Sequence, residues 1–136
     1  MSNKIYPIGI QNFEKIHKGG YCYIDKTALI YQIVKTGSYY FLSRPRRFGK
    51  SLLLSTLEAY FQGKKELFKG LAMEKLEKEW IKYPILHLDL NAEKYTTLEA
   101  LDQVLENALR GWEALYGAQD YEEIFASRFQ GVIQCA

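Results

Sequence analysis

A Gly-Lys-Ser tripeptide at positions 49–51 constrains the fold of this chain more than any other feature. It lies within YYFLSRPRRFGKSLLLSTLEAYF, residues 39–61. The residues before it, 38–43, form an aromatic and apolar run that is typical of a buried strand. The residues after it form an apolar segment, up to Gly63, that is typical of a helix. Because phosphate-binding loops connect a strand to a helix, this context predicts such a loop here.

The chemistry expected of this loop follows from its residue types. A loop of the pattern G-x-x-x-x-G-K-[ST] points successive backbone N–H groups at phosphate oxygens, and the N-terminus of the next helix adds partial positive charge. Lys50, the predicted catalytic residue, is expected to reach the β- and γ-phosphates of ATP. The Ser51 hydroxyl is the predicted ligand of Mg²⁺. The predicted nucleotide-binding residues are Arg44, Pro45, Arg46, Arg47, Phe48, Gly49, Lys50, Ser51 and Leu52.

Arg44 departs from the loop pattern because it stands where the first glycine is expected. A glycine there normally permits a backbone angle that is uncommon for other residues. Pro45 favours an extended conformation for Arg44, so the N–H groups nearest the phosphate are expected to come from residues 47–51. Two other interpretations stay open. The segment is a basic, solvated turn, or Arg46 and Arg47 bind nucleic-acid phosphates.

Apolar periodicity and turn residues predict the remaining elements. Helices are expected where apolar residues recur at helical spacing between capping residues. A second strand is expected where an apolar run begins with a proline, because a strand tolerates proline at its first position. The expected helices cover residues 25–37, one or two short stretches within 64–83, 97–117 and 120–136, and the expected second strand covers 84–91.

Strands that alternate with helices predict an α/β domain with a parallel sheet. Residues 1–24 are expected to form an irregular N-terminal arm with short elements, and residues 25–136 an α/β core. A buried parallel sheet usually has more than two strands, and the last expected helix runs to Ala136. The chain is therefore expected to be the N-terminal half of a larger domain.

Three segments resemble the predicted AAA-ATPase-like family. They are YPIGIQNFEKIHKGGYCYIDKTALIYQIV, YYFLSRPRRFGKSLLLSTLEAYFQGKKELFKGL and YPILHLDLN, and they follow one another in the family's order. The family comprises bacterial P-loop proteins that often carry a C-terminal PD-(D/E)XK nuclease-like domain. Its most specific motif here is SRPRRFGKSLLLSTLEAYF, and the resemblance makes Arg44 a family feature rather than a local defect.

This resemblance implies a P-loop NTPase fold of the AAA/ASCE type and, in the parent architecture, Mg²⁺-dependent ATP hydrolysis. In such proteins the helix similar to residues 120–136 precedes the Walker B strand, whose two terminal acids hold Mg²⁺ and polarise the attacking water. No run of four apolar residues followed by Asp-Glu occurs in this sequence. ATP binding is therefore expected, and turnover by this chain alone is doubtful. Two alternatives stay open: a non-catalytic protein-interaction module and a nucleic-acid-associated protein.

Other candidate residues have simpler explanations. Asp25 is a good N-cap for the helix that follows it, although the resemblance also allows the N-terminal arm to lie near the nucleotide base. Asp89, near the end of the second expected strand, is interpreted as a capping or packing residue rather than a catalytic acid. Ser43 and Ser55 have no base in a recognisable motif, so the sequence does not support nucleophilic catalysis.

Composition excludes some classes of protein and predicts partners only weakly. The formal net charge of +2 does not by itself predict nucleic-acid binding. No apolar run reaches membrane-spanning length, and Cys22 and Cys135 have no metal-ligand spacing, so a cytoplasmic protein without membrane contact is expected. An incomplete sheet would leave an open edge, which predicts self-association or a stabilising partner chain.

Overall fold

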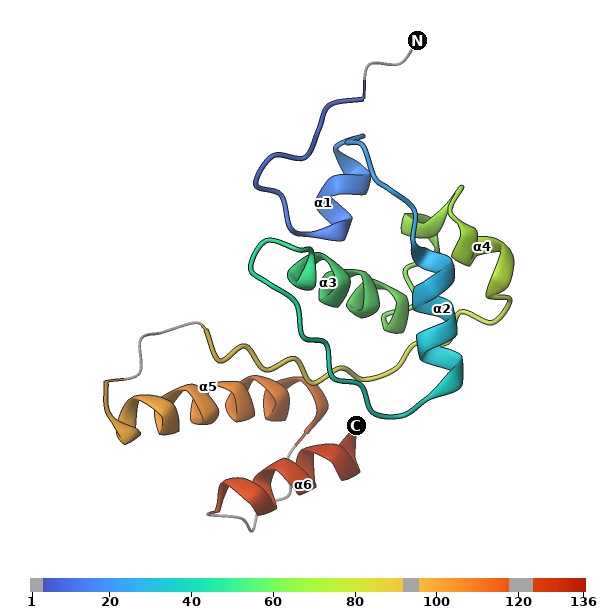
Figure 1. Cartoon of the computed structure of the whole chain (residues 1–136). Helices are drawn as coiled ribbons and strands as arrows, with labels where there is room; N and C mark the ends of the chain where they lie inside the picture. The colour runs from blue at the N-terminus through green and yellow to red at the C-terminus, as the bar shows by residue number, and fades with distance from the viewer. Residues whose placement is uncertain (1–3, 92–95, 118–123) are drawn as a thin grey trace. The chain divides into compact units, whose positions relative to one another are not determined.

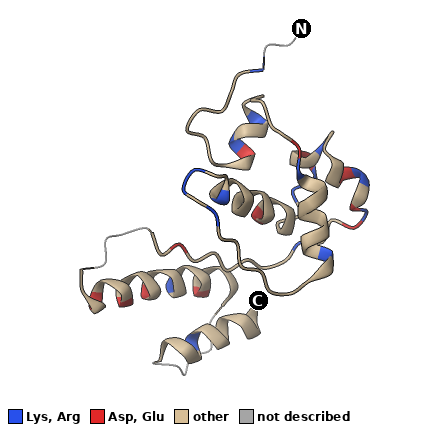
Figure 2. Ribbon diagram, viewed as in Figure 1, with Lys and Arg blue, Asp and Glu red and all other residues tan. Residues whose placement is uncertain are grey.

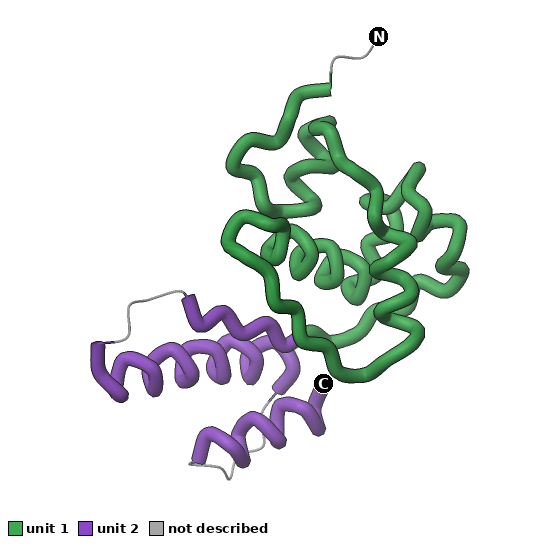
Figure 3. Tube along the Cα trace, in the orientation of Figure 1, with its two compact units in different colours: residues 1–85 green, residues 86–136 purple. Residues whose placement is uncertain are grey.

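The computed structural model describes residues 4–91, 96–117 and 124–136. The chain divides into two compact units, Met1–Ile85 and Leu86–Ala136, which Figure 3 shows in different colours. The described elements of both units are helical, and none of the described helices is long and apolar enough to cross a membrane.

The first unit contains short helices that pack around one aromatic cluster (Figure 1). Helix α1, Phe13–Lys18, packs against α3, Lys50–Phe61, and α2, Thr27–Thr36, packs against α4, Ala72–Leu76. The helices predicted over residues 25–37 and 64–83 and after Gly49 are all present. The expected irregular arm also contains a helix, α1. The elements are α1 Phe13–Lys18, α2 Thr27–Thr36, α3 Lys50–Phe61, the 3-10 helix η1 Lys65–Phe68 and α4 Ala72–Leu76.

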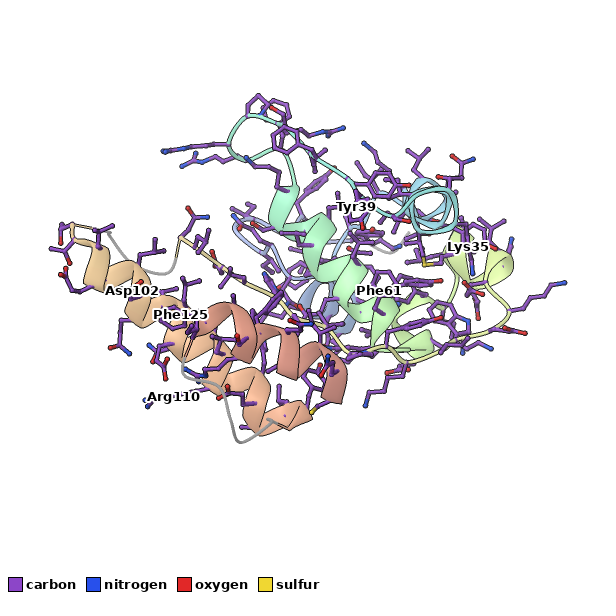
Figure 4. The ribbon with its side chains drawn as sticks, turned by 90° about the horizontal axis from the view of Figure 1, so that it is seen from below. Lys35, Tyr39, Phe61, Asp102, Arg110 and Phe125 are labelled. Atoms are coloured by element: carbon purple, nitrogen blue, oxygen red, sulfur yellow. The ribbon has the colours of Figure 1, made fainter. Side chains whose placement is uncertain are left out.

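Aromatic rings from distant parts of the sequence form the core of this unit. The Phe13 and Phe68 rings lie 4.9 Å apart, and the Phe68 and Trp80 rings 5.1 Å apart. Full burial of one such side chain contributes about 1.5–3 kcal/mol, so these rings account for much of the packing energy. Figure 4 labels Phe61, which packs on the cluster from the C-terminal end of α3. The buried members are Phe13, Ile30, Ala59, Tyr60, Leu67, Phe68 and Met73.

The second unit contains helices α5, Leu98–Tyr116, and α6, Phe125–Cys135, which pack against each other. Helix α5 begins where the sequence predicts, because the Thr97 hydroxyl accepts a hydrogen bond from the Ala100 N–H at 3.3 Å. Leu109 and Val132 are buried between apolar faces, and the Trp112 and Phe129 rings lie 5.9 Å apart. The start of the last predicted helix, residues 120–123, lies outside the described residues.

The predicted α/β P-loop fold with a parallel sheet is wrong for the described part of the chain, which has no strand. Residues 38–43 and 84–91 are assigned neither to a helix nor to a strand. Instead of being buried, the Tyr39 and Phe41 side chains are 97% and 93% exposed. An apolar run predicts an extended segment, but a strand also needs a neighbour for its N–H and C=O groups. The sheet edge proposed as a partner surface is likewise not formed by the described residues.

Candidate functional site

The predicted phosphate-binding residues form one surface loop that leads into α3. Residues 44–51 are exposed, whereas Leu52 is half-buried. Figure 2 shows the Lys and Arg positions of this loop in blue. Leu52 and Leu53 pack against the aromatic cluster, so the first turn of α3 is anchored while the loop before it faces solvent.

Left-handed backbone conformations shape the second half of the loop. Gly49 has a φ of 80° and is the N-cap of α3. Arg47 has a φ of 65°, and among the described residues it is the only one other than glycine with a positive φ. The left-handed conformation costs such a residue about 1–2 kcal/mol. Strain of this kind is often found at functional sites. Arg44 does not have a positive φ, so its position does not require a glycine.

The backbone N–H groups of this loop are available to a ligand. The N–H groups of residues 46–52 donate to no other group in the described part of the chain. The first bond of α3 is from the Leu53 N–H to the Gly49 carbonyl, at 2.9 Å. The first N–H groups of any helix lack partners within the helix, and here the turn before α3 adds further ones. This arrangement suits a group with several oxygen acceptors.

Lys50 folds back across the loop. Its Nζ donates a hydrogen bond to the Arg44 carbonyl at 2.9 Å, and this contact joins the first residue of the loop to the first residue of α3. The ammonium has two further protons to donate. The structure therefore brings together the two residues that the sequence singled out, the lysine and the arginine in place of glycine.

The other cations of the loop have no acidic partner. Arg44, Arg46 and Arg47 are exposed, and none of them forms an ion pair with a described residue. Figure 4 shows long side chains that end in nitrogen projecting from this loop. Phe48, between them in sequence, is 62% exposed. The loop is thus a concentrated positive surface on a chain of low net charge.

The only side-chain oxygen that the loop offers a metal is the Ser51 hydroxyl. It is exposed and hydrogen-bonded to no described residue. No group of three or more His, Cys, Asp or Glu side chains in the described residues is placed to hold a metal ion. Mg²⁺ commonly keeps several waters and shares its other ligands with phosphate oxygens, so one hydroxyl fits a metal that arrives with a nucleotide.

Asp25 has a structural role that is more extensive than capping. Its Oδ1 accepts hydrogen bonds from the Thr27 N–H and hydroxyl, at 2.9 and 2.6 Å, and its Oδ2 accepts one from the Ala72 N–H at 2.7 Å. Burial raises the pKa of this carboxyl, but the bonds from Thr27 and Ala72 outweigh burial and lower it. The N-cap position itself is Lys26. Asp25 therefore joins the start of α2 to the start of α4.

In contrast, the Asp89 side chain bonds a residue only two positions further along the chain. Its Oδ1 accepts a hydrogen bond from the Asn91 N–H at 2.9 Å, which closes a turn. The prediction that Asp89 caps the end of a strand is wrong, because residues 84–91 form no strand, and the side chain holds a turn instead. The cavities next to α1, of about 140 and 320 Å³, are lined by no residue of the loop 44–52, so the candidate site is an exposed loop and not a closed pocket.

Ser55 carries no recognisable motif in the sequence, but the structure places it between the loop and the N-terminal arm. Its Oγ lies 3.0 Å from the Phe13 nitrogen and 2.9 Å from the Leu52 carbonyl oxygen. No signal in the sequence identifies this contact, because the two segments that it joins are 42 residues apart.

Comparisons with known proteins place the chain in a family. A family model described as Predicted AAA-ATPase matches residues 7–136. A protein of Azotobacter chroococcum mcd 1, described as an uncharacterized protein in vnfD 5'region, is 48% identical over 89 residues. Those residues are 65% of this chain and 17% of that protein, so the chain matches only a small part of the relative's length. No solved structure gives a significant match.

Proposed function

This chain belongs to the predicted AAA-ATPase family, and we propose that residues 44–52 bind the triphosphate of ATP. The observation that carries the proposal is the run of N–H groups from residue 46 to residue 52, which donate to no described group. Successive N–H groups next to a helix N-terminus favour phosphate oxygens, because they combine hydrogen-bond donors with partial positive charge.

The residues of the loop contribute to phosphate binding in different ways. Lys50 is placed to exchange its bond with the Arg44 carbonyl for a bond to a phosphate oxygen, which is the stronger acceptor because it is charged. Gly49 and Arg47 hold the left-handed turns that keep the N–H groups unpaired. The exposed guanidinium groups of Arg44 and Arg46 add positive charge around the phosphates.

The proposed metal is Mg²⁺, held by the Ser51 hydroxyl together with the phosphates. When bound, such an ion neutralises charge that develops on phosphate oxygens. The contribution that we propose for this chain is this one oxygen ligand, because no group of three or more His, Cys, Asp or Glu side chains in the described residues is placed to hold a metal ion. We place the protein in the cytoplasm, since Cys22 and Cys135 are both free thiols, as a reducing compartment favours.

Calorimetric titration with Mg-ATP tests this proposal. Wild-type chain is expected to bind, and Lys50→Ala is expected to bind about 10- to 100-fold more weakly, the usual effect of losing a charged hydrogen bond. Lys65→Ala is the matched control, because Lys65 is equally exposed on η1 and lies outside the loop. It should bind like wild type.

Two further measurements sharpen the result. The proposed contacts reach only the phosphates, so GTP should compete with ATP at comparable concentrations. Ser51→Ala should reduce the difference between ATP affinity with Mg²⁺ and with a chelator. Equal binding by wild type and Lys50→Ala would contradict the proposal. Binding of DNA that weakens steeply with salt, and that is lost in Arg46→Ala/Arg47→Ala, would favour the nucleic-acid alternative instead.

A further inference from the structure

Ser55 lies on α3 one turn beyond Ser51, and its hydroxyl contacts two segments. The Oγ accepts a hydrogen bond from the Phe13 N–H at 3.0 Å and donates one to the Leu52 carbonyl at 2.9 Å. The Gln11 carbonyl, 3.3 Å away, is an alternative acceptor for the same proton. One hydroxyl thus joins the start of α1, within the N-terminal arm of residues 1–24, to the last residue of the phosphate-binding loop.

The first hydrogen-bond partner of Ser55, the Phe13 N–H, belongs to a residue whose side chain is held in the core. Its side chain is 1% exposed in the aromatic cluster, and its N–H is the first of α1. The first N–H groups of a helix have no partner within that helix. The Asn12 side chain satisfies the Lys15 N–H, and Ser55 satisfies the Phe13 N–H from a different element. Removing the Ser55 hydroxyl leaves that N–H without its partner.

The partner at Leu52 belongs to the candidate site. The Leu52 N–H is one of the groups that donate to no described residue, and its carbonyl is held by Ser55 and by the Thr56 hydroxyl, at 2.9 and 2.7 Å. These two bonds hold the carbonyl of Leu52 in place and thereby restrain the backbone of the residue that carries the last N–H of the loop. Ser55 therefore acts on the loop through Leu52 while it is itself held by the start of α1.

We propose that Ser55 is a positioning residue that couples the N-terminal arm to the phosphate-binding loop, so that nucleotide binding and ordering of the arm strengthen each other. This inference rests on the proposed function of the loop. Coupling between two sites is reciprocal: if the anchored arm raises nucleotide affinity, bound nucleotide must stabilise the anchor by the same factor. Both directions can be measured.

The first measurement is nucleotide affinity. Ser55→Ala is expected to weaken Mg-ATP binding about 3- to 10-fold, the usual effect of one hydrogen bond. Ser55→Thr restores the hydroxyl, so this variant should bind like wild type. Thr97→Ala is the control, because it removes a hydroxyl that accepts a hydrogen bond from a helix N–H, that of Ala100, outside the loop and the arm.

The second measurement is hydrogen exchange of the intact chain with and without Mg-ATP. In wild type, nucleotide should slow exchange in residues 11–16 as well as in the loop. In Ser55→Ala, nucleotide should slow hydrogen exchange in the loop and leave exchange in residues 11–16 unchanged. A purely structural Ser55 would speed exchange of residues 11–16 to the same extent in both conditions, so the response to nucleotide separates coupling from stability.

The outcomes distinguish this inference from the proposed function. If wild type does not bind Mg-ATP, both are overturned. If wild type binds, Lys50→Ala does not, and Ser55→Ala binds like wild type, only the coupling is overturned. If Ser55→Ala fails to fold, the exchange experiment on wild type still decides, because unchanged exchange in residues 11–16 on nucleotide binding overturns the coupling.

Discussion

Glu77 is a buried carboxylate that links three parts of the first unit. It is 5% exposed, and its Oε2 accepts a hydrogen bond from the Tyr60 hydroxyl at 2.5 Å and lies 3.0 Å from the Lys35 Nζ. Its Oε1 accepts a hydrogen bond from the Glu79 N–H at 3.1 Å. Burial raises the pKa of Glu77, but the bonds from Tyr60 and Lys35 outweigh it and lower the pKa below 4.5. Figure 4 labels Lys35 at the end of α2.

We expect Glu77→Gln to destabilise the chain by about 1–3 kcal/mol at pH 7, because it removes the charge that Tyr60 and Lys35 bind. A carboxyl with a lowered folded pKa stabilises the fold above its unfolded pKa, and this contribution is lost as pH falls through the folded pKa. The difference between wild type and Glu77→Gln should therefore be constant near neutral pH and shrink below about pH 4.5. Urea unfolding at several pH values measures it.

The control for this prediction is Glu66→Gln, an exposed glutamate on η1. It should change the free energy of unfolding by less than about 0.5 kcal/mol at every pH. A Glu77→Gln difference that stays the same between pH 7 and pH 3 would show that the carboxylate charge is not what Tyr60 and Lys35 require.

At the scale of elements, the pairing of α5 with α6 depends on a planar cation between two acids. The Arg128 Nε and Nη2 each donate to a different oxygen of Glu113 at 2.8 Å, and its Nη1 donates to Glu106 at 2.5 Å. The side chain is 17% exposed, so water screens these bonds only partly. The bonds that it donates to Glu113 and Glu106 raise the pKa of Arg128 further. They also lower the pKa of both glutamates.

We expect Arg128→Lys to weaken the packing of α6 on α5, because a lysine ammonium cannot form the forked pair with Glu113 and reach Glu106 as well. We expect the free energy of local opening to fall by about 1 kcal/mol, and faster hydrogen exchange of the α6 amides measures this change. Arg110→Lys is the matched control. The Arg110 side chain is 72% exposed and bonds only Glu106 among described residues. The free energy lost in Arg110→Lys should therefore be as small as is usual for ion pairs on a protein surface. Equal effects of the two substitutions would contradict the special role of Arg128.

For the whole molecule, the central prediction concerns turnover. The sequence has no apolar strand that ends in Asp-Glu, and the described residues have no acidic cluster near the loop. Removal of one such electrostatic group typically costs a rate factor of about 100–1,000. We therefore expect the chain to bind Mg-ATP without steady phosphate release above the level of Lys50→Ala. Release that depends on Lys50 would show that another acid takes this role.

Much of the candidate site could be predicted because its signals are local. The Gly-Lys-Ser tripeptide, the helix after it and the absence of a requirement for glycine at position 44 all depend on residues within a few turns of one another. The unpaired N–H groups of residues 46–52 follow from the same local geometry. The strained backbone of Arg47 could not be predicted, since no residue type near it demands a positive φ.

By itself, the sequence determined that most of the described helices form and where the positive loop lies. Helical periodicity and caps such as Thr97 record interactions within one or two turns. Only the tertiary structure decided which segments meet. Residues 38–43 look like a strand, but a strand exists only where a second segment supplies its hydrogen bonds. For the same reason, the bonds from Phe13 to Ser55 and from Ala72 to Asp25 join residues 42 and 47 positions apart, and no local pattern encodes them.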